Sequence, residues 1–239
     1  MNTAIWTTVF GSLGIIVSAF ESKKGKFLGK CARAWAKVIL FCGGIKYTVK
    51  NLDNLNLSNS YIFAGNHSSG FDILLGFAGL PFWIVSIAKI ELRSILILGT
   101  VMRIAGHIFV DRKNHENAMA SLKKASISLK KLPRSVLLYP EGTRTRDGSI
   151  QKFKPGGLLL AVETGIPIVP IYYSGTYSIL KQGSWKVNNQ KLKLIIGKPI
   201  FTEKYSFETR RELAKKVQSE VVKLSKTFKE KKENVIVDK

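Results

Sequence analysis

Cysteine is scarce in this chain, and its two copies are badly placed for a bridge. Cys31 and Cys42 are the only cysteines among 239 residues. On one helix, eleven residues would separate them by about 16 Å along the axis, which is beyond the reach of a disulfide. Neither has histidine partners nearby at zinc-ligand spacing. A disulfide-stabilised scaffold is therefore excluded, and the two thiols suit a reducing compartment or simple packing.

Acidic side chains are the second shortage. Sixteen Asp and Glu residues stand against 38 Lys and Arg, so the formal net charge is +22 at pH 7. Apolar residues make up 45 % and charged residues 23 %, which is the composition of a globular protein and not of a disordered polyelectrolyte. Its basic surface attracts an anionic partner, whether nucleic acid, a lipid bilayer or a phosphorylated substrate. Charge by itself does not choose among them.

Long hydrophobic runs are nearly absent, which excludes a multi-span transporter. The exception is residues 1–20, which carry no charged side chain but contain six Asn, Thr and Ser residues that dilute their hydrophobicity. This run is barely long enough to span a bilayer. Because basic residues follow it, the positive-inside rule places the rest of the chain in the cytosol.

A basic stripe comes next. Lys26, Lys30, Arg33 and Lys37 recur at spacings of 4, 3 and 4, which places them on one face of a helix, with apolar residues elsewhere. The pattern is typical of a helix in a membrane interface, although an amphipathic helix docked on a protein core shows the same pattern. We expect residues 1–44 to form N-terminal membrane-associating helices that bind anionic phospholipid at the cytoplasmic face of the cell membrane.

Beyond residue 44, short apolar runs alternate with helical patterns. A helix is predicted over residues 114–132, and a last helix over residues 207–228. The alternation predicts an α/β domain over residues 45–239, with a largely parallel mixed sheet flanked by helices. In such sheets, ligands bind beyond the carboxyl ends of the strands. The predicted strands are residues 45–49, 61–64, 84–87, 108–110, 136–139 and 168–173.

The first candidate site directly follows the strand predicted at residues 61–64. It contains His67 and Asp72, which would lie about 140° apart on one continuous helix and would not meet there. Across a strand–turn–helix junction they can meet, and Asp72 can then hold one imidazole nitrogen while the other acts as a base. The alternative is a loop histidine beside a helix-capping aspartate. The neighbouring serines lack the surroundings of a nucleophile elbow.

Arginine marks the end of another predicted strand. The strand closes on Asp111 and Arg112, and a guanidinium suits phosphate, although a surface charge pair would look the same. His107, just before the strand, and His115, after it, are interpreted as a strand-edge and a helix-surface residue. Together with His67 they lack the spacing and the carboxylates of a metal site.

Two more segments follow. After the strand at residues 136–139 come Glu141, Gly142, Thr143 and Arg144. Backbone N–H groups, the threonine and the arginine suit a phosphate cradle, and a solvated basic loop is the alternative. The last segment, at residues 166–171, is an apolar strand entered through prolines, and we interpret it as a core strand.

Together, in this order and at these intervals, the four segments resemble the motif blocks of the glycerolipid acyltransferase family, specifically its bacterial 1-acyl-sn-glycerol-3-phosphate acyltransferases. The resemblance covers about residues 61–176, roughly half of the chain. One departure is Leu96, where the family commonly has proline. The matching positions are His67 and Asp72, then Phe109, Asp111 and Arg112, then Pro140, Glu141, Gly142, Thr143 and Arg144, and finally Pro167, Val169 and Pro170.

The resemblance implies acyl transfer from acyl-CoA or acyl-carrier protein to the sn-2 hydroxyl of lysophosphatidate, which gives phosphatidate for phospholipid synthesis. It implies His67 as general base, Asp72 as the group that orients it, and no metal or redox cofactor. The fourth segment, interpreted as a core strand, is in addition a candidate lining for the path of the acyl chain. The residues expected to hold the acceptor's phosphate are Arg112, Glu141, Gly142, Thr143 and Arg144, with Glu141 ordering the arginines.

Two alternatives stay open at this point. One is acyl transfer to another acceptor, either glycerol 3-phosphate or a different lysolipid. The other is a basic nucleic-acid-binding protein, which the net charge allows. Because no basic–aromatic recognition module is present and the apolar N-terminus has no role in such a protein, nucleic acid is not the expected partner.

Overall fold

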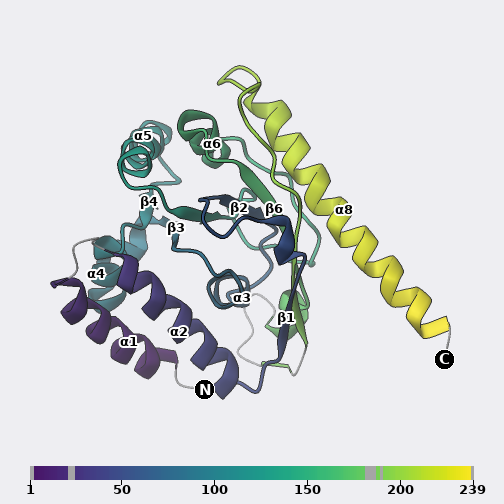
Figure 1. Cartoon of the computed structure of the whole chain (residues 1–239), viewed down its shortest axis with the longest axis horizontal. Coiled ribbons are helices and arrows are strands. Elements are labelled where there is room, and N and C mark those ends of the chain that lie inside the picture. Colours follow the sequence, from purple (N-terminus) through teal and green to yellow (C-terminus); the bar gives the residue numbers. More distant parts are fainter. Residues whose placement is uncertain (1–2, 21–24, 181–186, 189–190, 238–239) are drawn as a thin grey trace.

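One sheet forms the centre of the molecule (Figure 1). The computed structural model describes residues 3–20, 25–180, 187–188 and 191–237. Its strands are β1 (Tyr47–Lys50), β2 (Ile62–Gly65), β3 (Ile84–Lys89), β4 (Ile108–Val110), β5 (Ser135–Leu138), β6 (Ile168–Ser174) and β7 (Leu192–Ile196). Within the described residues they pair in the order β1-β7-β6-β2-β5-β3-β4, and each pair is parallel except β6 with β7. The predicted α/β class and mostly parallel mixed sheet are confirmed.

Helices cover both faces of the sheet (Figure 1). On one face lie α1 (Thr3–Ser18), α2 (Lys26–Cys42), α3 (Phe71–Gly79) and α4 (Leu96–Ile104), and on the other α5 (His115–Lys131), α6 (Leu159–Thr164) and α8 (Arg210–Val237). The short α7 (Thr176–Ile179) follows β6. Successive strand residues point to opposite faces, so Phe63 joins the core under α3 while Ile62 joins the core under α5 and α8.

The predicted helix at residues 114–132 illustrates how the sequence sets an element's bounds. The Asn114 side chain accepts a hydrogen bond from the backbone N–H of Asn117, which caps the first turn. Leu122, Ala125 and Leu129 are buried on the inner face. The helix ends at Lys131, just before the segment that contains Pro133. Capping, periodicity and proline therefore agree on one helix.

One strand was not predicted. β7 pairs antiparallel with β6 and parallel with β1, and its run of Leu192, Leu194, Ile195 and Ile196 is buried. The last helix also begins later than predicted and continues further, from Arg210 to Val237. The six predicted strands are present, each within two residues of its expected bounds.

The N-terminal segment departs from its prediction. The apolar face of α2 is buried, with Leu28, Ala36, Ile39 and Leu40 at 2 % exposure or less, so this face packs on the protein and does not enter a membrane. α2 contacts α3, while α1 bridges α2 and α4. Trp35 Nε1 on α2 donates to Thr7 Oγ1 on α1 at 3.1 Å. The docked alternative is therefore correct for α2.

The spanning alternative for the N-terminus is also not supported. Across the described ranges, every helix is too short or too polar to cross a bilayer.

Candidate active site

The carboxyl ends of neighbouring strands bring the predicted segments together. β2 ends at Gly65 and leads to His67, and β5, paired with β2, ends at Leu138 and leads to Tyr139. β4 ends at Val110, directly before the Asp111–Arg112 pair, and lies two places further along the sheet. Because these strands are parallel, their carboxyl ends share one edge of the sheet. Three of the four predicted segments therefore meet at one site.

His67 and Asp72 are in direct contact, as the strand–turn–helix interpretation predicts. His67 Nδ1 lies 2.9 Å from Asp72 Oδ2. The same carboxylate oxygen accepts the backbone N–H of Ser68 at 2.6 Å and of Ser69 at 2.8 Å. Asp72 stands in the first turn of α3 and its side chain is 0 % exposed. The loop therefore wraps around a buried carboxylate, whose position is fixed by two backbone donors.

This contact sets the protonation pattern of the imidazole. A carboxylate is an acceptor, so it favours the tautomer that carries its proton on Nδ1 and leaves the lone pair of Nε2 available. The His67 side chain is 12 % exposed and lines a cavity. A proton acceptor with a buried carboxylate behind it is the arrangement of a general base.

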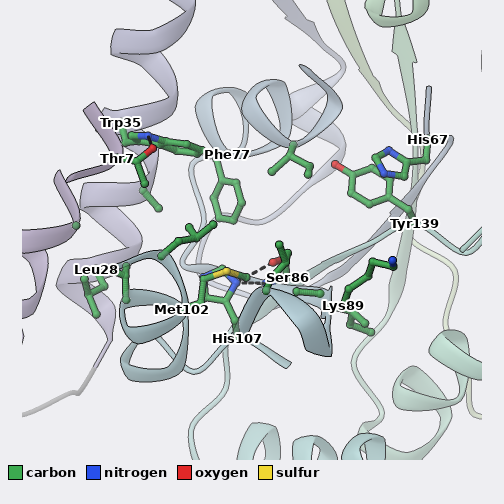
Figure 2. A pocket seen from close by; sticks show the side chains of 18 of the residues that line it. Thr7, Leu28, Trp35, His67, Phe77, Ser86, Lys89, Met102, His107 and Tyr139 are labelled. Atoms are coloured by element: carbon green, nitrogen blue, oxygen red, sulfur yellow. Dashed lines mark hydrogen bonds between the residues drawn. The ribbon is translucent and has the colours of Figure 1, made fainter. Parts of the chain in front are cut away.

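Tyr139 forms the face against which His67 packs. The two rings are stacked, with centroids 4.1 Å apart and planes inclined by 18°, as Figure 2 shows. The Tyr139 hydroxyl is buried and interacts with the hydroxyl of Tyr173, whose ring lies 5.9 Å away, centroid to centroid. The sequence analysis gave Tyr139 no role, because a ring contact between two strand ends leaves no local signal in the sequence.

Glu141 has a different place from the predicted one. It is 2 % exposed and accepts the backbone N–H of His67 on Oε1 at 3.1 Å. In the part of the chain that the structure describes, it forms no ion pair with an arginine. The prediction that it orders the arginines is wrong, because its carboxyl points back under the His67 loop. Burial, reinforced by Asp72, raises the pKa of Glu141 to about 8.

The loop after β5 therefore holds His67 from both sides. Glu141 accepts from the His67 N–H, and the His67 carbonyl accepts the backbone N–H of Thr145 at 2.9 Å. Tyr139 also stacks on the ring and Asp72 binds Nδ1, so two contacts hold the backbone of His67 and two hold its imidazole. Such support keeps a reacting group in one geometry.

The remaining predicted residues surround the mouth of the site. Arg112, Gly142, Thr143 and Arg144 line the same cavity as His67. Arg112 donates from Nη1 to the Gly142 carbonyl. The Gly142 N–H donates to the Tyr139 carbonyl at 3.0 Å, so it is used within the turn and is not available to an anion. With its φ of +80°, Gly142 allows the turn instead.

Two lysines join these arginines and were not predicted. Lys89, at the end of β3, lines the cavity. The Lys154 ammonium lies 3.3 Å from the position that a Cβ on Gly142 would occupy. With Arg112 and Arg144, the mouth therefore carries four cationic side chains from four segments. This density of positive charge suits a phosphate.

Behind the mouth lies a largely apolar cavity of about 530 Å³. Its walls come from α1, α2, α3, α4 and β3, and Figure 2 shows Trp35, Phe77 and Met102 turned toward one another across it. Such a lining suits a hydrocarbon chain. The fourth predicted segment contributes none of the lining residues, so it does not line this cavity. β6 lies in the middle of the sheet, as a core strand does.

Comparisons with known proteins agree with this geometry. The Acyltransferase family model matches residues 46–174. The 1-acyl-sn-glycerol-3-phosphate acyltransferase of Saccharomyces cerevisiae is 32 % identical over 217 residues, which cover 89 % of this chain and 71 % of the yeast protein. The chloroplastic LPAT1 acyltransferase of Arabidopsis thaliana is 33 % identical over 191 residues, 79 % of this chain and 52 % of the plant protein.

The fold comparison points the same way. The crystal structure of a 1-acyl-sn-glycerophosphate acyltransferase, PlsC, from Thermotoga maritima superposes with a TM-score of 0.76 at 24 % identity, over 94 % of this chain and 95 % of that one. It shares the fold. The chain spans about half the length of several curated plant relatives, 54 % of the Brassica napus protein and 52 % of the Arabidopsis one. On the family match and the yeast relative together, the chain belongs to the acyltransferase family.

Proposed function

We propose that this chain transfers an acyl group from a thioester, acyl-CoA or acyl-carrier protein, to the sn-2 hydroxyl of lysophosphatidate, which gives phosphatidate. One observation carries the proposal: the His67–Asp72 pair stands where an apolar cavity meets a cationic mouth. A phosphorylated acceptor and a fatty acyl donor need these two surroundings side by side. The names of the relatives, which are 1-acyl-sn-glycerol-3-phosphate acyltransferases, support this choice of acceptor.

In the proposed reaction, His67 Nε2 takes the proton of the acceptor hydroxyl as its oxygen attacks the thioester carbonyl. The new C–O ester bond forms, the C–S bond breaks, and the departing thiolate receives the proton from the imidazolium. Asp72, 2.9 Å from Nδ1, stabilises that imidazolium while it exists. General-base assistance of this kind contributes about 10²–10⁴-fold to the rate. The hydroxyl attacks directly, so no acyl-enzyme intermediate is needed.

The phosphate of the acceptor is assigned to Arg112, which follows β4, and to Arg144, with Thr143 beside Arg144 in the loop after β5. A guanidinium binds phosphate through two parallel N–H donors. Because these arginines and His67 line one cavity, a phosphate held at the mouth places the glycerol hydroxyls toward the imidazole. Gly142 gives the loop its turn, and Glu141 supports the His67 backbone from below.

The acyl chain is assigned to the apolar cavity. Cys31 on α2 lines it, while Cys42 is exposed, which offers a test that does not depend on turnover. In a Cys42→Ser background, an acyl thioester is expected to slow the alkylation of Cys31 by a small thiol reagent. Equal alkylation rates with and without a saturating donor would exclude the chain from this cavity.

We also propose that α1 contacts the membrane. Ile5, Val9, Leu13 and Ile16 follow one face of α1 at helical spacing and are 48–62 % exposed. Leu96, at the start of the α4 helix that packs on α1, is 84 % exposed. Exposed basic residues on α2, Lys26, Lys30 and Lys37, would then attract anionic lipids of the cytoplasmic leaflet. Such a helix lies in the interface and does not span it.

A vesicle-flotation assay tests this contact. The protein is expected to float with vesicles that contain anionic phospholipid, and Val9→Asp with Leu13→Asp is expected to abolish flotation. Unchanged flotation of that double variant would overturn the role of α1. The matched control is Ile127→Asp on α5, which changes a residue that is 51 % exposed on the opposite side of the sheet.

An acceptor panel tests the activity itself. Labelled acyl-CoA and acyl-carrier protein are offered with lysophosphatidate, glycerol 3-phosphate and other lysolipids. Phosphatidate is the expected main product. If lysophosphatidate gives no product while another acceptor does, the proposed acceptor is wrong and the acyltransferase chemistry stands.

A further inference from the structure

The cavity proposed for the acyl chain contains a second histidine, which the proposed transfer does not use. His107 directly precedes β4 and lies opposite Ser86 on β3, since Ile108 is in register with Ile87. Both side chains line the cavity between Phe77 and Met102 (Figure 2). Ser86 is in register with Leu137, two residues before Tyr139. This polar pair therefore lies further back along the strands than the His67 end.

The contacts of His107 fix its tautomer. The backbone N–H of Ser86 donates to Nδ1 at 3.0 Å, and the Ser86 hydroxyl lies 2.8 Å from the same nitrogen. Because a backbone N–H is only a donor, Nδ1 must be the acceptor, and the proton of the neutral ring is on Nε2. Burial, reinforced by the charge of Arg134, lowers the pKa of His107 to about 4. The ring is therefore neutral near pH 7.

The Nε2–H group of His107 opens on the cavity without a partner. Within the described ranges, the hydrogen bonds of this ring involve Nδ1 alone. Nε2 is also not among the fully enclosed polar atoms that lack a hydrogen bond, and His107 lines the cavity. Its surroundings are apolar, and the Phe77 ring lies 6.0 Å away, centroid to centroid. A donor in such surroundings favours a ligand that brings an acceptor to it.

We propose that His107 recognises an oxygen atom carried by the acyl chain, so that the preferred donor is a thioester whose hydrocarbon chain bears a hydroxyl or keto group. A plain chain leaves Nε2–H against methylene groups, whereas either oxygen accepts its hydrogen bond. The proposal rests on the acyl transfer proposed above and on the cavity as the acyl site. It adds a substrate class and leaves the chemistry at His67 as it is.

Two substitutions distinguish the roles of the two ring nitrogens of His107. The amide oxygen of His107→Asn can replace Nδ1 as acceptor for Ser86, and nothing then reaches the position of Nε2. His107→Gln is the converse, because its longer amide brings an N–H donor toward the position of Nε2. A purely structural role through Ser86 requires Nδ1, whereas recognition of the chain requires the N–H of Nε2.

The test compares donors within one enzyme. Acyl thioesters of one chain length, plain or with a single hydroxyl or keto group at successive positions, are supplied on coenzyme A and on carrier protein with lysophosphatidate as acceptor. In the wild type, kcat/KM for at least one oxygenated position is expected to exceed that of the plain chain about tenfold or more. His107→Asn is expected to bring this ratio close to one, and His107→Gln to retain part of it.

Three results would count against a proposal. If no position of the oxygen raises kcat/KM above that of the plain chain in the wild type, His107 does not recognise the chain, and this result needs no variant. If His107→Asn keeps the wild-type ratio, another group selects the oxygen. If neither plain nor oxygenated donors give phosphatidate, the proposed function itself fails.

Discussion

Two histidines face the same cavity and have opposite surroundings. His67 stands at the mouth with a buried carboxylate on Nδ1, so its Nε2 carries a lone pair. His107 stands further back with a backbone N–H on Nδ1, so its Nε2 carries a proton. One ring is built to accept a proton and the other to donate a hydrogen bond. The partner of Nδ1, and not the shared cavity, therefore decides the role open to each of these histidines.

The largest effect is expected from removing the His67 imidazole, the proposed proton acceptor. His67→Ala is expected to lower kcat for transfer to lysophosphatidate by about 10²–10⁴-fold, because the hydroxyl then lacks its base. His107→Asn, at the other end of the cavity, is expected to lower kcat by far less. Both are compared in the same radiolabel assay, with thermal unfolding and vesicle flotation as checks on the fold. Similar losses in the two variants would remove the distinction between the histidines.

The mouth can be tested separately from the ring. Arg144→Ala is expected to raise KM for lysophosphatidate by about 10–100-fold, since a hydrogen bond to a charged group is lost. kcat should change less, because the base is intact. The control is Arg146→Ala, two residues further on, whose side chain does not line the cavity. An equal loss with a monoacylglycerol, which has no phosphate, would contradict the assignment.

The role of the Tyr139 ring that stacks on His67 can be tested with two substitutions. Tyr139→Phe keeps the face at 4.1 Å and removes only a buried hydroxyl beside that of Tyr173, so activity within about twofold of wild type is expected. A stack of this kind stabilises by about 1 kcal/mol. Tyr139→Leu removes the face and is expected to lower kcat several-fold while KM stays close to wild type. If Tyr139→Phe loses as much as Tyr139→Leu, the hydroxyl matters and stacking does not.

The smallest expected effect concerns how the free energy of unfolding depends on pH. The pKa of His107 falls to about 4 in the folded chain, below its usual 6.5, so the folded form binds fewer protons than the unfolded one between these values. Stability is then lost as the pH falls through this window. The pKa of Glu141 rises to about 8 from 4.5, so its contribution is instead lost as the pH rises from 4.5 to 8.

Urea unfolding at pH values between 4 and 9 measures how the free energy of unfolding changes with pH. The two contributions have opposite slopes and offset each other where their windows overlap, between pH 4.5 and 6.5. His107→Asn is therefore expected to leave a loss of stability as the pH rises from 4.5 to 8, and Glu141→Gln a gain of stability as the pH rises from 4 to 6.5. A profile that keeps both slopes in both variants would show that other groups titrate in these windows.

The first block could be predicted from the sequence because its signals are local. The predicted strand–turn–helix junction allows Asp72 to reach His67, and the contact is present at 2.9 Å. The alternation of apolar runs and helical patterns likewise predicted the α/β class. Local periodicity and spacing are sufficient where the contacts join residues near in sequence.

The contacts that sequence reasoning missed join distant segments. Tyr139 stacks on His67 across a strand pair, and Glu141 is bonded to a backbone group 74 residues away. β7 has a buried apolar run, but its place between β1 and β6, parallel to the first and antiparallel to the second, depends on the whole sheet. His107 sits at the strand edge as predicted, yet its side-chain direction depends on Ser86 of the neighbouring strand. These features arise from tertiary packing and leave no periodic pattern.

The order of events at His67 is open to one direct measurement. The protein is mixed with an acyl thioester labelled in its acyl chain, with and without lysophosphatidate, and the release of free thiol is followed together with label on the protein. General-base transfer at His67 predicts no protein-bound label, and thiol released with the acceptor in a 1:1 ratio to phosphatidate. A burst of thiol with label on the protein in the absence of acceptor would contradict it, because it would show an acyl-enzyme.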